Sequence, residues 1–207
     1  ITRKSASEGI VLLENKNVIV KPRVSSGSRG FRILKNNHKL DYNDISGKSD
    51  DLSKIVDSST YRNIIKKHND LSNTLMMEYL EGQDYSVYAL AEKGNSLVTI
   101  PFKRLNPKDG VSLVSEVDMN EIVIDYVKKI IKLFNLDWVV NIQLKLSPDN
   151  KPLIYEINPR LAGSVILTKG ANCDLIKYGL DVILNKKIKI NNPRTCKMIR
   201  YYTEVLI

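Results

Sequence analysis

The stretch that decides the fold is NIQLKLSPDNKPLIYEINPR, residues 141–160. Two segments of alternating apolar and polar residues flank the turn-forming sequence SPDN, and this pattern predicts a β-hairpin. Side chains alternate between the two faces of a strand, so a two-residue turn at Asp149-Asn150 gives one consistent apolar face. In that register Ile142 faces Ile157, Leu144 faces Tyr155, and Leu146 faces Leu153.

The opposite face of this hairpin is polar. The same register puts Gln143 directly opposite Glu156, with Asn158 next along the strand and Arg160 just beyond it. Hard divalent cations such as Mg²⁺ prefer oxygen ligands of this kind and keep waters or phosphates as further ligands. Taken alone, the hairpin is equally typical of a solvated sheet face, and that interpretation is the simpler one.

The composition is that of a globular protein. The chain has 207 residues, of which 43% are hydrophobic and 27% charged, and no apolar run reaches the ~20 residues of a membrane helix. The start, ITRKSASEG, has no apolar signal-peptide core. The two cysteines lack metal-site spacing. We therefore expect a reduced, cytoplasmic setting without a membrane partner.

The net charge of +9 allows two interpretations. One is an anionic partner such as nucleic acid or phosphate. The other is lysine spread over solvated faces, and we favour it because lysines cluster only in short pairs and tyrosines do not interleave with them. A basic nucleic-acid binder would explain the charge but none of the ligand pattern, so we expect no nucleic-acid partner.

The remaining pattern predicts an α+β fold, with strands meeting in hairpins and few helices. Asp118 and Glu121 resemble a capping box that starts a helix. Five apolar residues at helical spacing then predict its core-facing stripe. They are Ile122, Tyr126, Ile130, Ile131 and Phe134. Further helices are expected near residues 50–68 and 173–184, and a closing strand over 197–207.

Three other segments could serve phosphate chemistry. Lys21 ends a β-branched strand just before a proline, and the small residues of SSGSRG, 25–30, could crowd backbone N–H groups around an anion. The alternative for 25–30 is a plain hairpin loop. MMEYLEGQDYSV, 76–87, is an extended segment broken at a glycine, and Lys103 and Arg104 end another strand. In isolation each has an ordinary structural explanation.

In this order, the segments VIVKPRVSSGSRG, MMEYLEGQDYSV and NIQLKLSPDNKPLIYEINPR resemble the ATP-grasp superfamily. The resemblance is strongest to the ATP-binding halves of the carbamoyl phosphate synthetase large subunit and its stand-alone relatives. It implies two lobes, each with an antiparallel sheet and helices, and nucleotide between them. Residues 1–79 would form the small lobe with a glycine/serine-rich lid loop, and 80–207 the larger lobe with the metal-binding hairpin. The N-terminal domain that usually precedes this module is expected to be absent.

The resemblance also implies a role for each matching residue. Lys21 would touch the inner phosphates, beneath a lid that includes Ser26, Gly27 and Ser28. Glu78, Tyr79 and Leu80 would form the hinge beside adenine, and Asp84 would bind ribose, although the hinge-to-acid segment is one residue shorter than in the synthetase. Gln143, Glu156 and Asn158 would hold Mg²⁺, with Mn²⁺ as an alternative. Catalysis would rest on Glu156, Asn158 and Arg160, the last stabilising the transferred phosphoryl group.

The implied activity is ADP-forming ligation of a small-molecule carboxylate to an amine or similar nucleophile. The carboxylate would take the γ-phosphoryl group of ATP, and the nucleophile would then displace phosphate. The alternative from another class is a non-catalytic nucleotide-binding or regulatory domain. The intact set of Glu156, Asn158 and Arg160 favours catalysis. The acceptor substrates and the oligomeric state stay open, a homodimer included.

Overall fold

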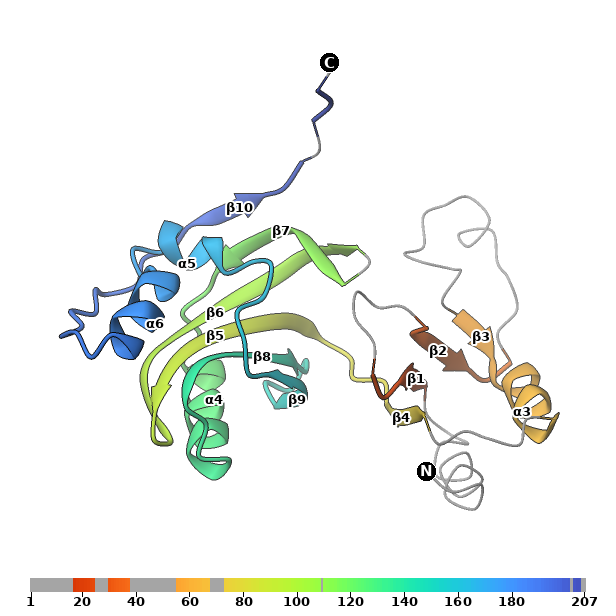
Figure 1. The fold of residues 1–207 in the computed structure, drawn as a ribbon. Helices are drawn as coiled ribbons and strands as arrows, with labels where there is room; N and C mark the ends of the chain where they lie inside the picture. The colour runs from red at the N-terminus through yellow and green to blue at the C-terminus, as the bar shows by residue number, and fades with distance from the viewer. Residues whose placement is uncertain are drawn as a thin grey trace. The chain divides into compact units, whose positions relative to one another are not determined.

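The computed structural model describes residues 17–24, 30–37, 55–67, 73–108, 110–201 and 203–205 (Figure 1). The chain divides into two compact units, Ile1–Tyr79 and Leu80–Ile207. Within the described residues, no helix has both the length and the apolar character needed to cross a membrane.

Unit 1 is a four-stranded sheet with one described helix. The strand order is β3-β2-β1-β4, with β1 antiparallel to β2 and β4, and β3 parallel to β2. Val18, Val20 and Leu34 form its core together with Tyr61 of the helix and Met76 of β4. The elements are β1 (Val18–Pro22), β2 (Arg32–Lys35), β3 (Ile55–Asp57), α3 (Ser58–Lys67) and β4 (Thr74–Glu78).

The helix expected over 50–68 begins only at Ser58 in the described part of unit 1. Ile55 and Val56 pair with β2 instead, as β-branched residues favour. Asp57 Oδ2 then caps the helix by accepting hydrogen bonds from the backbone N–H groups of Ser59 at 2.9 Å and Thr60 at 3.2 Å.

Unit 2 is a six-stranded antiparallel sheet covered on both faces. The strand order is β10-β7-β6-β5-β8-β9. Helix α4 packs on one face, and α5 and α6 pack on the other (Figure 1). The strands are β5 (Gln83–Glu92), β6 (Asn95–Lys108), β7 (Val111–Val117), β8 (Trp138–Leu146), β9 (Pro152–Asn158) and β10 (Lys197–Ile199), and the helices are α4 (Glu121–Leu133), α5 (Ile166–Gly170) and α6 (Leu175–Ile183).

Strand β5 shows how the two faces of this sheet differ. Tyr85 and Val87 face the α4 side and are fully buried there, whereas Tyr88 faces the core beneath α5 and α6. Asp84 and Ser86 share the face of Tyr88 but precede it in the strand. The break before β5 depends on Gly82, which has φ +110° and whose added Cβ would lie 2.1 Å from the carbonyl oxygen of Leu146.

The capping box expected at Asp118 and Glu121 is wrong. The N-cap of α4 is Asn120, whose side-chain oxygen accepts from the backbone N–H groups of Ile122 at 3.0 Å and Val123 at 3.3 Å. Asp118 instead accepts a 2.5 Å hydrogen bond from the Tyr85 hydroxyl and pairs with Lys103 at 3.0 Å.

The apolar stripe of α4 is also displaced from the expected one. Ile122 and Phe134 are 45% and 58% exposed. Nine of the fourteen residues in 121–134 are apolar, so more than one apolar stripe fits helical spacing and the pattern alone did not choose the buried one. The closing strand is shorter than expected and is described only over Lys197–Ile199. The residues of α4 that are buried are Val123, Ile124, Val127, Ile130 and Ile131.

The β8–β9 hairpin closes through three residues rather than two. Ser147 N–H donates to the carbonyl of Lys151 at 3.0 Å, and Asn150 adopts the left-handed conformation with φ 56°. This is a common form of three-residue hairpin loop. An odd loop shifts the pairing by one residue, so Leu144 pairs with Ile154 rather than Tyr155, and Leu146 pairs with Pro152 rather than Leu153.

A β-bulge at Tyr155 then restores the expected register. The pairing shifts between Gln143 and Leu144, and beyond the shift Gln143 pairs with Glu156 and Ile142 with Ile157. The bulge supplies one extra residue to β9. As a result Tyr155 leaves the α4 side and joins Glu156 on the polar face, which corrects the expected apolar face.

Candidate functional site

The candidate site is the polar end of the sheet face opposite α4 in unit 2. Ser86 pairs with Gln143 across β5 and β8, and Gln143 pairs with Glu156 across β8 and β9. In the next row Asn141 pairs with Asn158. The structure therefore brings the three expected metal ligands, Gln143, Glu156 and Asn158, onto neighbouring positions of one sheet face.

The side-chain oxygens of Gln143, Glu156 and Asn158 accept no hydrogen bond from any residue that the structure describes. Gln143 uses its amide nitrogen, which donates to Asn141 Oδ1 at 3.4 Å. The side chains of Glu156 and Asn158 form no hydrogen bond or ion pair with any described residue, and all three are half-buried. Two amide oxygens and one carboxylate form a hard-oxygen set that fits Mg²⁺ or Mn²⁺. Within the described ranges no group of three or more His, Cys, Asp or Glu residues could hold a metal.

A second row of polar side chains lies beside these three residues, and its members bind one another. Asp84, 9% exposed, is bound by Arg104 at 3.1 Å, by Lys145 at 3.8 Å and by the Tyr155 hydroxyl at 2.8 Å. Arg104 also lies 3.3 Å from the Tyr155 hydroxyl and donates to the carbonyl of Gly110 at 3.1 Å. The row thus joins β6, β5, β8 and β9 side by side.

Burial and the neighbouring Asp84 carboxylate raise the pKa of Tyr155 well above its ordinary value. Its hydroxyl therefore stays protonated and donates to Asp84 at any physiological pH. The expected ribose ligand, Asp84, already has these partners. Arg104 is engaged here, while Lys103 pairs with Asp118.

The loop after β9 comes close to Tyr88, on the sheet face that carries the candidate site. Arg160 is exposed and donates to the carbonyl of Leu161 at 3.2 Å. Arg200 fixes the loop by donating to the carbonyl of Gly163 at 2.9 Å. Burial raises the pKa of Tyr88 to about 12, while hydrogen bonds to Ser164 and Ser86 and the charges of Arg104 and Arg160 lower it. Arg160 is therefore close enough for its charge to affect Tyr88, which lies on the same face of the sheet as Gln143.

The expected site residues of unit 1 lie at the ends of strands. Lys21 is half-exposed in β1, and alternation puts it on the face opposite the Val18 and Val20 core. Glu78 ends β4, and the backbone N–H of Tyr79 donates to the carbonyl of Asn17 at 2.9 Å. Ser26, Gly27 and Ser28 lie outside the described residues. Leu80 is the first residue of unit 2.

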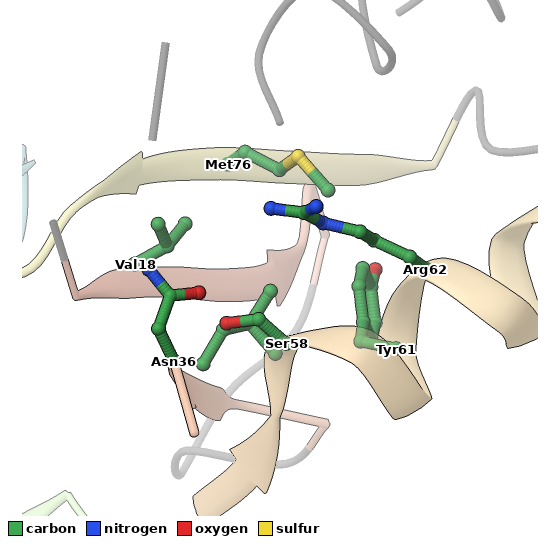
Figure 2. Close-up of a pocket in the computed structure, with 7 residues that line it drawn as sticks. Val18, Asn36, Ser58, Tyr61, Arg62 and Met76 are labelled. Atoms are coloured by element: carbon green, nitrogen blue, oxygen red, sulfur yellow. The ribbon is translucent and has the colours of Figure 1, made fainter. Parts of the chain in front are cut away.

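A small pocket lies in unit 1. Figure 2 shows Tyr61 and Arg62 of α3 and Val18 and Met76 of the sheet around it. Because Val18 lines it, this pocket is on the α3 side of the sheet, opposite the face of Lys21. It is therefore distinct from the expected phosphate contact. The full lining is Val18, Leu34, Asn36, Ser58, Tyr61, Arg62 and Met76.

Sequence reasoning missed three members of the site in unit 2: Asn141, Lys145 and Tyr155. Asn141 is completely buried between β5 and β9. A polar residue at an alternating position of so apolar a strand was a usable signal for it. No pattern signalled Tyr155, because its face depends on the bulge.

Comparison with protein-family models gives one match, over residues 70–205, to a family described as ATP-grasp in the biosynthetic pathway with Ter operon. The match covers β4 and all the described elements of unit 2. A comparison with curated proteins found no match.

Solved structures share the fold at low sequence identity. The biotin carboxylase domain of Hydrogenobacter thermophilus 2-oxoglutarate carboxylase, with MgADP and bicarbonate, is 14% identical, with TM-score 0.62 over 92% of this chain and 42% of that one. Staphylococcus aureus N5-carboxyaminoimidazole synthetase with ADP is 12% identical, with TM-score 0.62 over 96% and 49%.

The N5-carboxyaminoimidazole synthase of Aspergillus clavatus, in complex with ADP and 5-aminoimidazole ribonucleotide, is 13% identical, with TM-score 0.61 over 91% of this chain and 45% of that one. This chain thus spans less than half the length of these three proteins. At such identities the likeness establishes the fold alone.

Proposed function

Because this chain belongs to the ATP-grasp family described as acting in the biosynthetic pathway with the Ter operon, we propose that it is an ATP- and Mg²⁺-dependent ligase module. The observation that carries the proposal is the set of three available oxygen ligands, Gln143, Glu156 and Asn158, on one sheet face. Units 1–79 and 80–207 would be the small and large lobes.

The metal set would work by neutralising phosphate charge. When bound, Mg²⁺ would supply Lewis-acid stabilisation of the phosphoryl oxygens. Glu156 carries the one full negative charge of the set and is the natural bridge if two ions bind. Mn²⁺ would fit the same oxygens.

Positively charged side chains would complete phosphate binding. We assign Lys21 to the inner phosphates and Arg160 to the transferred phosphoryl group, where each would make charge-assisted contacts. Ser26, Gly27 and Ser28 would belong to the lid over the triphosphate. These residues position reactants and stabilise charge, which is the main protein contribution to phosphoryl transfer.

The nucleotide base would bind near the hinge, Glu78 to Leu80. The backbone N–H of Tyr79 already donates to the carbonyl of Asn17, so the N–H of Leu80 is the better donor to adenine. We assign Asp84 a different role from the ribose contact that the resemblance implies. Its carboxylate is held by Arg104, Lys145 and Tyr155, so Asp84 would line the site beside the three metal ligands.

The proposed reaction has two steps. A carboxylate oxygen of a small-molecule substrate attacks the γ-phosphorus of ATP, and the bond to the β–γ bridging oxygen breaks to release ADP. An amine or similar nucleophile then attacks the acyl carbon of the acyl phosphate and expels inorganic phosphate. A specificity like that of carbamoyl phosphate synthetase rests on the sequence resemblance.

Substrate-dependent ADP release tests this function. The protein is incubated with Mg-ATP and a panel of carboxylates and bicarbonate, each with and without amines, and ADP is measured by a coupled assay. We expect ADP formation that depends on one acceptor and falls at least ~100-fold in Arg160→Ala. A non-catalytic nucleotide-binding domain would bind ATP but release no ADP with any acceptor.

A further inference from the structure

Asn141 is a polar residue with no solvent exposure, on the same sheet face as Gln143, Glu156 and Asn158. It lies on β8, two residues before Gln143, and is paired with Asn158 of β9. Its amide nitrogen donates to Ser86 Oγ at 2.8 Å and approaches the carbonyl oxygen of Val87 at 3.5 Å. A buried amide with this many partners has a fixed place in the strand.

These contacts fix the orientation of the side-chain amides of Asn141 and Gln143. The Val87 carbonyl can only accept a hydrogen bond, so it selects the nitrogen end of the Asn141 amide. The oxygen end of Asn141 must then point the other way, toward Gln143. That oxygen accepts from the Gln143 nitrogen at 3.4 Å, and Gln143 Oε1 is consequently the end left for a ligand.

We propose that Asn141 is a positioning residue that holds the amide of Gln143 with its oxygen toward the metal of the nucleotide complex. The inference rests on the proposed Mg²⁺-nucleotide function. A glutamine without this restraint could present its NH₂ group, which cannot bind a cation. The backbone carbonyl of Val87 thus orients the Asn141 amide, and the Asn141 amide in turn orients the oxygen of Gln143 as a metal ligand.

A double-mutant comparison separates this role from a merely structural one. Asn141→Leu is made in the native protein and in a Gln143→Glu background, and the Mg²⁺ dependence of ATP binding is measured by calorimetry. Glutamate has two oxygen atoms and no amide to orient. We therefore expect Asn141→Leu to weaken the apparent Mg²⁺ affinity about 10-fold or more beside Gln143, and less than about 2-fold beside glutamate.

The control variant is Ser115→Ala in the same sheet. Ser115 is 1% exposed and donates to Ser112 at 2.6 Å, so its loss removes a buried hydrogen bond away from the site. We expect its unfolding midpoint to fall while its Mg²⁺ affinity stays unchanged. If Asn141→Leu fails to fold, Asn141→Ser takes its place, because serine is smaller and polar.

The outcomes are distinct. Equal loss of Mg²⁺ affinity in both backgrounds, or no loss in either, would overturn the positioning role while leaving the metal site intact. ATP binding by the native protein that is indifferent to Mg²⁺ would instead remove the proposed metal site itself. A loss confined to the Gln143 background supports the role of Asn141.

Discussion

Replacing Arg104 by methionine tests the polar row that walls the candidate site. The Arg104 and Asp84 side chains are only 9% and 11% exposed and lie 3.1 Å apart. Removing one partner of such a pair leaves a charge with little access to water, which costs ~3–5 kcal/mol. Lys145 remains 3.8 Å from Asp84 and Tyr155 still donates to it. We therefore expect the lower end, a loss of ~3 kcal/mol in the free energy of unfolding.

Urea denaturation followed by tryptophan fluorescence measures this loss in unit 2. The chain has one tryptophan, Trp138, and its indole N–H donates to the carbonyl of Gly179 at 3.1 Å within that unit. The matched control is Lys128→Met, which breaks an exposed ion pair with Asp125 at 3.8 Å. The control should lose less than ~1 kcal/mol.

A double variant, Arg104→Met with Asp84→Asn, should recover part of the loss, because no uncompensated charge remains. If Arg104→Met loses no more than the Lys128 control, the row is not a buried charge cluster, and the reasoning is refuted.

Three further changes test other parts of the structure. Lys21→Ala should weaken ATP binding by ~1.5–3 kcal/mol through loss of a charge-assisted contact, and unchanged affinity in calorimetry would contradict its phosphate role. Asn120→Ala should lower the free energy of unfolding by ~1 kcal/mol through loss of the α4 cap, whereas Asp118→Ala should leave that cap intact. The pKa of Tyr88 is raised from 10.0 to about 12, so its contribution to stability is complete below pH 10 and is lost as pH rises to 12. Tyr88→Phe should flatten this part of the stability curve, and an unaltered curve between pH 10 and 12 would show that Tyr88 does not titrate as proposed.

The hairpin shows what the sequence could predict and what it could not. The pairing of Gln143 with Glu156 is confirmed, because alternation of apolar residues constrains which side chains share a face. The length of the hairpin loop and the register next to it were predicted wrongly. A three-residue loop and a bulge at Tyr155 shift the register twice, and the two shifts cancel. Neither the loop length nor the bulge can be recognised from the alternation of apolar and polar residues.

Long-range polar contacts explain most of the remaining differences. Asp118 has the right spacing for a cap, yet Tyr85 and Lys103 compete for its carboxylate from distant positions in the chain. Asp84 similarly meets Arg104 and Tyr155 only once four strands are assembled. Residue patterns within one segment carry no information on such partners, whereas they did predict the α+β fold and the strand break at Gly82.

The dependence of ATP binding on Mg²⁺ tests the central claim most directly. Calorimetric titration of ATP is performed with Mg²⁺ and with EDTA, for the native protein, for Glu156→Ala, and for Glu92→Ala as an exposed carboxylate control. The account predicts that Mg²⁺ strengthens ATP binding in the native protein and the control, and that Glu156→Ala abolishes this gain because it removes the one charged ligand of the set. Equal ATP affinity with and without Mg²⁺ in the native protein would contradict it.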